Sequence, residues 1–242
     1  MQSLSGQPSI NLFGFTIMEP MVMLTNFLIT AVCIFAYIHL KKVSTDKKVT
    51  QYFRYYFIFM ALATFFGGTF GHAFQHIFGT PWKLLGWLFG MISIFLISHA
   101  SLLYAKPFFN KKFILIFKLV NFIALLIFAG LTIRTVDFNF VQIHSIFGFL
   151  ALVMPLHIVL FTKTGNEGSK LMVFTICFTS LSAFIFTYKV SFGVWFNHLD
   201  IAHTILAFSM YFFYLASLKL SESPTNHIDS PNTVTIDASN KT

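Results

Sequence analysis

Two short segments of this sequence place ionisable side chains where apolar runs begin and end. The segment Asn197-His-Leu-Asp-Ile-Ala-His203 opens the last long apolar run, and Gly71-His-Ala-Phe-Gln-His76 closes the second one. An ionisable group close to hydrocarbon is costly, so such groups usually pair with one another and mark a functional site. These histidines and carboxylates are therefore the candidate chemistry of the chain.

The spacing of these residues is compatible with a metal centre. On a regular helix His72 and His76 share one face, and Thr69 lies one turn before His72. Asp200 and His203 are three residues apart and also share a face. Catalytic zinc takes three protein ligands and keeps a fourth position for water. The pattern therefore predicts a site shared between two helices.

The same residues also have interpretations without a metal. Asn197, His198 and Asp200 all fall in a first helical turn, where they can cap the helix. His198 is five residues before His203, a poor spacing for joint ligation from one regular helix. A histidine near the interface can also simply hydrogen-bond a neighbouring backbone group.

Glu19 and Thr69 have similar alternatives. Glu19 precedes Pro20 at the start of the first apolar run, where the positive helix end favours a carboxylate. Thr69 has the ordinary role of a helix hydroxyl, a bond to the backbone of the preceding turn.

The composition places most of the chain in a bilayer. Of 242 residues, 56% are hydrophobic, 10% are charged and 34 are Phe. A soluble domain of this size needs far more polar surface. The formal charge of +8 comes from basic residues in short loops, which argues for lipid phosphate and against a nucleic-acid groove. Cys33 and Cys177 fall inside apolar runs and are predicted to be buried thiols.

The apolar runs predict an all-α polytopic membrane protein with seven transmembrane helices. Each run is close to the ~20 residues that cross a bilayer as a helix. The predicted spans are residues 19–39, 55–78, 84–104, 113–133, 138–161, 171–188 and 195–218. We divide the chain into an N-terminal extracytoplasmic segment (1–17), a seven-helix domain (18–218) and a disordered cytoplasmic tail (219–242) that is rich in Ser, Thr, Asn and Asp.

Basic residues in the loops predict the orientation. With the N-terminus outside and the C-terminus in the cytoplasm, the inner side carries eleven Lys and Arg and the outer side carries three. The inner set is Lys41, Lys42, Lys47, Lys48, Arg54, Lys106, Lys111, Lys112, Lys163, Lys170 and Lys219. The outer set is Lys83, Arg134 and Lys189.

Depth then groups the polar residues into one layer. At ~1.5 Å of rise per residue, five histidines and two carboxylates fall within about 12 Å of the outer interface. They are Glu19, His72, His76, His144, His198, Asp200 and His203. His99 and His157 lie deeper, toward the inner side.

This constellation resembles a known superfamily. A histidine late in helix two and a paired-histidine segment in helix seven are similar to the alkaline ceramidases and the progestin/adiponectin-receptor-type proteins, which are intramembrane zinc-dependent hydrolases of lipid amides. More closely, Glu19-Pro20 and the segment from Asn197 to His203 resemble a bacterial family of small seven-helix proteins without assigned function. The superfamily carries Ser four residues before the helix-two histidine, whereas this chain has Gly68, with Thr69 beside it.

The resemblance implies a zinc-dependent hydrolase of a lipid amide or ester in a bacterial inner (plasma) membrane, with its site near the outer leaflet. The candidate zinc ligands are His72, His76, His198 and His203. Zinc lowers the pKa of its bound water to about 7 and polarises a carbonyl group. Asp200 or Glu19 then serves as general base or orients a ligand, and Thr69 is the candidate catalytic hydroxyl.

Two other classes of function stay open. A haem b electron carrier would pair His144 with His72 or His76, and His99 with His157 on the inner side. A small-ligand sensor or transporter would use the polar layer as its binding pocket. The expected partners are membrane lipids and a lipid substrate, with no nucleic acid, and the sequence does not indicate an oligomeric state.

Overall fold

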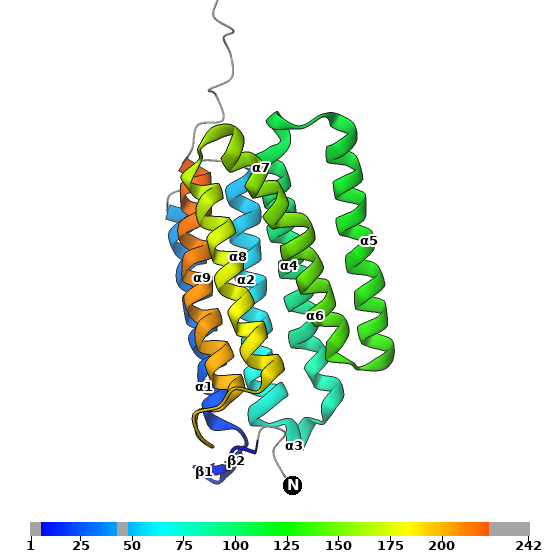
Figure 1. The fold of residues 1–242 in the computed structure, drawn as a ribbon. Helices are drawn as coiled ribbons and strands as arrows, with labels where there is room; N and C mark the ends of the chain where they lie inside the picture. Colours follow the sequence, from blue (N-terminus) through cyan, green and yellow to red (C-terminus); the bar gives the residue numbers. More distant parts are fainter. Residues whose placement is uncertain (1–5, 43–47, 223–242) are drawn as a thin grey trace, which may run out of the picture.

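The computed structural model describes residues 6–42 and 48–222, and helices that run along one common axis dominate it (Figure 1). In chain order they are α1 (Pro20–Lys42), α2 (Lys48–Phe66), η1 (Gly67–Ala73), α3 (Gln75–Phe78), η2 (Thr80–Trp82), α4 (Lys83–Ala105), η3 (Lys106–Phe108), α5 (Lys111–Thr135), α6 (Phe138–Ile146), η4 (Phe147–Val153), α7 (Met154–Thr164), α8 (Glu167–Tyr188) and α9 (His198–Glu222). Within the described ranges, seven helical stretches are long and apolar enough to cross a membrane. The prediction of seven apolar helices is therefore confirmed.

Most of the long helices pack against two or more neighbours. α2 packs along α4, α8 packs along α9, and α1 contacts both α2 and α9. Large side chains such as Tyr56, Phe57 and Phe213 are fully buried between them. α5 stands at the edge of the bundle against α4 and α6 (Figure 1), and most of its large apolar side chains are exposed, as expected of a helix that faces lipid.

The second span differs from the predicted regular helix that reaches residue 78. After Phe66 the chain widens into η1, a π-helix in which the Phe74 amide N–H bonds the Thr69 carbonyl. Phe74 then leaves helical geometry, with φ −118° and ψ 22°, before the short α3 begins. The wide turn and the break together mean that residues on the two sides of Phe74 do not share a face as they would on one regular helix.

Close backbone contact fixes the position of η1 against α4. A Cβ added at Gly86 would lie 2.8 Å from the Ala63 carbonyl oxygen and 2.9 Å from the Gly67 nitrogen. Gly86 is buried, so the two helices meet backbone to backbone at this point. Any side chain at Gly86 would push η1 away from α4.

The N-terminal segment forms a small β-hairpin before α1. Strands β1 (Ile10–Leu12) and β2 (Phe15–Ile17) are antiparallel, with Leu12 opposite Phe15 across a two-residue turn. Both turn residues, Phe13 and Gly14, have positive φ, which matches the twist of tightly joined strands. The hairpin sits at the end of the bundle where α1 begins (Figure 1).

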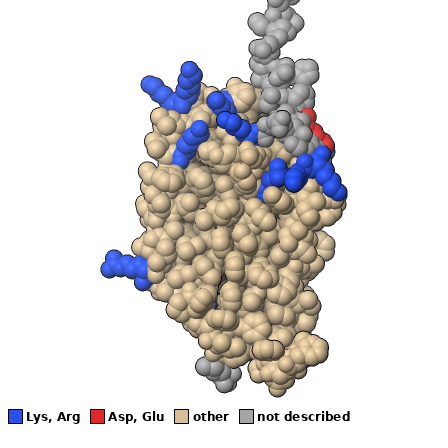
Figure 2. All heavy atoms as spheres, turned by 180° about the vertical axis from the view of Figure 1, so that it is seen from behind, with Lys and Arg blue, Asp and Glu red and all other residues tan. Residues whose placement is uncertain are grey.

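The basic residues are distributed unevenly along the bundle, and the chain end departs from prediction. Lys and Arg gather at the end of the molecule away from the hairpin (Figure 2), although Lys47 lies outside the described residues. α9 continues to Glu222, so the predicted start of the tail at 219 is wrong, because Leu220 is buried and packs over Gly168. The rest of the predicted tail, 223–242, is also outside the described residues.

The two thiols have different environments. Cys33 is buried in the core, as predicted. Cys177 is exposed on α8, so the prediction of a buried thiol is wrong there, because much of α8 faces outward from the bundle.

Candidate functional site

The Glu19 carboxylate and the His72 ring form a short hydrogen bond at the hairpin end of the bundle. Glu19 Oε2 lies 2.6 Å from His72 Nδ1, and the Glu19 side chain is almost completely buried. Glu19 has φ +46°, a left-handed conformation that is uncommon for a residue with a side chain. Its carboxylate therefore bonds a specific histidine and does not merely complement the dipole of α1.

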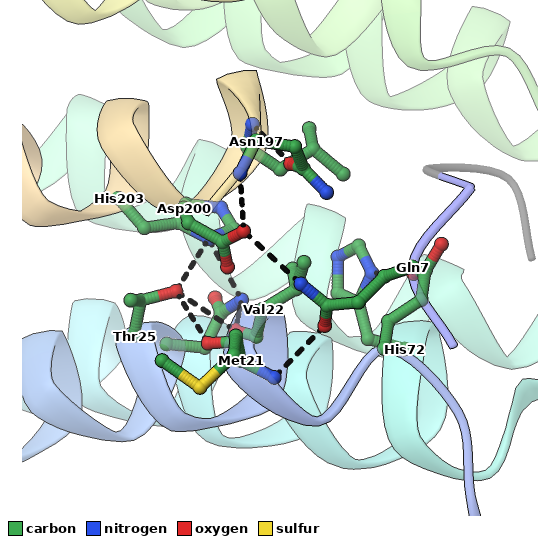
Figure 3. A network of polar contacts seen from close by, with 11 residues as sticks. Gln7, Met21, Val22, Thr25, His72, Asn197, Asp200 and His203 are labelled. Atoms are coloured by element: carbon green, nitrogen blue, oxygen red, sulfur yellow. Dashed lines mark hydrogen bonds and ion pairs between the residues drawn. The ribbon is translucent and has the colours of Figure 1, made fainter. Parts of the chain in front are cut away.

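His203 is held by the neighbouring turn of α1 (Figure 3). The Asn26 side-chain nitrogen Nδ2 lies 2.9 Å from the Val22 carbonyl oxygen and 3.2 Å from His203 Nδ1. Thr25 Oγ1 is 3.4 Å from the same ring nitrogen. Because a carbonyl oxygen can only accept, Asn26 must present its NH₂ group here, and its second hydrogen faces His203. His203 Nδ1 is then the acceptor, and the proton of the neutral ring is on Nε2.

Asp200 caps the start of α9. Its Oδ2 atom accepts the Asn197 backbone N–H at 2.9 Å, while Asn197 Oδ1 accepts the Leu199 N–H at 2.9 Å. This reciprocal arrangement is a capping box, as the capping interpretation of the segment predicted. Gln7 Nε2 donates a second hydrogen bond to Asp200 Oδ2 at 3.2 Å, and Gln7 Oε1 accepts the Met21 N–H at 2.9 Å (Figure 3). Gln7 therefore joins the starts of α1 and α9.

Two glycines of η1 allow neighbouring elements to approach it, Gly68 on the side of α1 and Gly71 on the side of α4. A Cβ at Gly68 would lie 3.0 Å from Asn26 Cβ and 3.4 Å from the Met23 carbonyl oxygen. Gly71 leaves room for the Lys83 side chain, whose Cγ would be 3.7 Å from an added Cβ, and the charge of Lys83 interacts with that of Glu19. The Ser that the ceramidase-like pattern has at the position of Gly68 would press on Asn26 in this structure.

The structure gathers four of the predicted site residues at one end of the bundle. Glu19, His72, Asp200 and His203 share the hairpin end of the bundle, and the rings of His72 and His203 have centroids 6.1 Å apart at 77°. We call these four residues the polar cluster.

Three predicted residues make no side-chain hydrogen bond to the polar cluster in the described part of the chain. His76 lies beyond the break at Phe74, and its Nδ1 is buried with no hydrogen-bond partner in the described part of the chain. His198 contacts the ring of Phe186 on α8. Thr69 Oγ1 is buried without a bond to any described residue, so the expected backbone bond is absent.

The donor set does not fit a three-ligand zinc site. Among residues 6–42 and 48–222, no three His, Cys, Asp or Glu side chains lie close enough to hold one metal ion. His72 has the carboxylate partner on Nδ1 that zinc-binding histidines usually have. His203 does not, because Asn26 donates to its Nδ1 and leaves the ring proton on Nε2. The regular helix that would have added His76 ends before it.

The histidines proposed as haem ligands have other partners in the structure. His157 is fully buried, with Nε2 3.0 Å from Ser101 Oγ and Nδ1 3.0 Å from Ser169 Oγ. Both ring nitrogens are engaged, so His157 connects α4, α7 and α8 and presents no nitrogen to iron in this arrangement. His144 packs its ring against Phe128 on α5.

Sequence reasoning missed two residues of the site. Gln7 lies in an uncharged stretch without periodicity, and nothing in the sequence indicates that it bonds Asp200. Thr25 reads as an ordinary helix hydroxyl, and it does bond the Met21 carbonyl at 3.0 Å. Asn26 could have been identified from the sequence, since it lies two turns after Glu19 on the same face of the predicted first helix.

The fold and the site define a bundle with seven helices long and apolar enough to cross a membrane, and with a partly buried polar cluster at one end. The chain belongs to a family of unknown function, DUF6962, whose sequence profile matches residues 21–222. No curated protein and no solved structure matches it. The resemblance to alkaline ceramidases therefore gains no support from relatives, and the family that is found has no assigned function.

Proposed function

We propose that this protein is an intramembrane hydrolase of lipid esters or amides that works by acid–base chemistry of two histidines. The observation that carries the proposal is the 2.6 Å contact between Glu19 and His72, with His203 opposite. A carboxylate that accepts the Nδ1 proton of an imidazole fixes its orientation and leaves the Nε2 lone pair to act as a general base.

The second histidine has the complementary role. His203 accepts at Nδ1 from Asn26, so its Nε2–H is a donor. The ring centroids lie 6.1 Å apart, and in this mechanism one water molecule and one carbonyl group bind beside the pair, in reach of both rings. His72 would take a proton from water while His203 donates to the carbonyl oxygen that becomes negative in the transition state.

The reaction balances with water as the other substrate. The water oxygen bonds the carbonyl carbon, its proton passes to His72 Nε2, and the oxyanion accepts from His203 Nε2–H. The carbon–oxygen or carbon–nitrogen bond then breaks, and the leaving alcohol or amine takes the proton from His72. General acid–base catalysis of this kind contributes roughly 10²–10⁴-fold.

The depth of the site suggests the substrate. Glu19 directly precedes α1 and Asp200 lies in the first turn of α9, so the polar cluster lies where spanning helices meet the interface. The ester and amide linkages of membrane lipids lie at this depth, between acyl chains and head groups. Zinc is not part of this mechanism, because the donor set does not fit it.

We also propose that the polar cluster faces the outside of a bacterial inner membrane. The basic residues at the far end of the bundle, visible in Figure 2, support this orientation by the positive-inside rule. In this placement the N-terminal hairpin is extracytoplasmic.

The test is lipid hydrolysis by the purified full chain in detergent-free nanodiscs. Phospholipid, diacylglycerol and ceramide are supplied, and released fatty acid is measured by mass spectrometry. His72→Asn keeps a donor near Glu19 and removes the base, so we expect at least about 100-fold less product. His39→Asn, a histidine at the opposite end of α1, is the matched control and should be fully active.

Three outcomes would contradict the proposal. The His72→Asn variant could remain fully active, or no lipid in the panel could be cleaved. Alternatively, a strong chelator could abolish activity and zinc restore it, which would place a metal at the site after all.

A small-ligand receptor is the second candidate, and one observation favours it. Asp200 Oδ1 and Asn197 Nδ2 are buried and have no hydrogen-bond partner among the described residues. An acceptor and a donor of this kind suit a small polar ligand. A nanodisc sample that cleaves no lipid but gains thermal stability from a polar small molecule, and loses that gain in Asp200→Ala, would favour this alternative.

A further inference from the structure

We propose that the β1–β2 hairpin is a lipid-binding element whose apolar face lies in the head-group region of the same leaflet as the polar cluster. The proposal concerns a surface that the hydrolase mechanism does not use, and it stands whether or not the protein cleaves lipids. Its evidence comes from the hairpin's two faces, its turn and its attachment.

The hairpin is amphipathic. Cross-strand partners and alternate residues share a face, so Ile10, Leu12, Phe15 and Ile17 lie on one side. The opposite side carries Asn11 and Thr16, whose side chains bond each other at 2.9 Å. On the apolar side Leu12 is 47% and Phe15 63% exposed, although a ribbon of two strands needs a packing partner for that face.

The turn places a further apolar side chain at the tip. Phe13 has φ +50° and is 92% exposed. Left-handed turn positions favour Gly, Asn and Asp, and an exposed Phe at this position gains nothing from the protein itself. A lipid interface accounts for it, because aromatic rings concentrate at that depth.

The attachment of the hairpin limits what can cover it. The Met18 N–H bonds the Ala73 carbonyl at 2.9 Å at the end of η1, and α1 begins at Pro20. The strands extend roughly 10 Å, from three residues at ~3.4 Å each, whereas each interfacial layer of a bilayer is about 5–8 Å thick. A hairpin of this length, attached to the end of a spanning helix, therefore lies within reach of the lipid head groups.

Composition and surroundings support lipid as the occupant. Residues 6–18 contain no charged side chain. Beside the hairpin, the loop that joins α8 to α9 exposes Phe192, Val194 and Trp195, and Gln7 Nε2 bonds the Trp195 carbonyl. Two apolar surfaces thus lie at the same end of the bundle, as an interfacial belt requires.

Site-directed spin labelling of the full chain tests the proposal. The protein carries Cys177→Ser, since Cys177 is the exposed thiol and Cys33 is buried, and a single nitroxide at Phe13→Cys. Asn11→Cys, on the polar face of the same hairpin, is the matched control. Collision rates with oxygen and with a water-soluble nickel complex are measured in phosphatidylcholine nanodiscs.

We expect the label at residue 13 to collide at least about threefold more with oxygen, relative to nickel, than the label at residue 11. Equal nickel accessibility at both positions would place the hairpin in water and overturn the proposal. Protection of residue 13 from both reagents would also overturn it, because a protein partner or a second copy would then cover the tip. Phe15→Cys on the same face repeats the measurement if Phe13→Cys does not fold.

Discussion

Replacing Gly86 with Ala tests the backbone contact that positions η1, and Gly90→Ala on the same helix is its control. Both changes remove a glycine from the interior of α4, which by itself stabilises a helix by about 0.5–1 kcal/mol. They differ in the space available. A Cβ at Gly90 meets Ala63 Cβ at an ordinary 3.8 Å, whereas a Cβ at Gly86 meets backbone atoms of Ala63 and Gly67 at 2.8 and 2.9 Å.

The clash at Gly86 cannot be relieved by rotating a side chain, because the atoms it meets belong to the backbone. Overpacking of this kind costs about 1–3 kcal/mol. We therefore expect Gly90→Ala to be neutral or slightly stabilising. Gly86→Ala should be less stable than Gly90→Ala by about 1–3 kcal/mol, which is a factor of roughly 5–150 in the unfolding equilibrium.

The assay is equilibrium unfolding in mixed micelles, followed by circular dichroism as the fraction of denaturing detergent rises. Equal midpoints for the two variants would refute the close approach of α4 and η1. Lipid hydrolysis gives a second readout, since a shift of η1 moves His72 relative to Glu19 and should lower activity in Gly86→Ala but not in Gly90→Ala.

Two further substitutions test other contacts of the bundle. Gly68→Ala places a Cβ 3.0 Å from Asn26 Cβ, so we expect the hydrogen bond between Asn26 and His203 to weaken. The ¹⁵N chemical shift of His203 Nδ1 should change as a result. An unchanged shift would show that α1 and η1 move apart without disturbing this bond. Ser101→Ala leaves His157 Nε2 without its hydroxyl partner and should destabilise the protein by about 1–3 kcal/mol. Ser98→Ala on the same helix removes a backbone-directed hydroxyl and should have little effect; equal losses for the two serines would contradict the role of His157.

The sequence was sufficient to predict the positions of the helices and the depth of the polar residues along them. Hydropathy and helix length depend on local composition, so seven spans could be located within seven residues of their observed ends. Depth follows from counting residues along a helix. It placed Glu19, His72, Asp200 and His203 at one end of the bundle, where the structure has them.

Rotation about the helix axes was not predictable from the sequence. The expectation that His72 and His76 share a face assumed a regular helix, but η1 is a π-helix and the chain breaks at Phe74. The pairing of Glu19 with His72 depends on how closely η1 approaches α1, which the contact at Gly68 determines. That contact joins residues far apart in the chain, so no local sequence pattern predicts it.

The side chain at position 26 decides which chemistry the cluster supports. Asn26 donates to His203 Nδ1 and bonds the Val22 carbonyl, and it thereby keeps the His203 ring proton on Nε2. A carboxylate at this position can only accept, so it would move the proton to Nδ1 and free the Nε2 lone pair, as in the carboxylate–histidine pairs of zinc sites.

Asn26→Asp should therefore invert the tautomer of His203, which ¹⁵N spectra of histidine-labelled protein detect directly. Hydrolysis should fall with it, because His203 would lose the donor that meets the carbonyl oxygen. A variant with the inverted tautomer and full activity would show that His203 does not stabilise the transition state. A variant that keeps the wild-type tautomer would instead show that the Thr25 hydroxyl, 3.4 Å from the same nitrogen, determines the position of the proton.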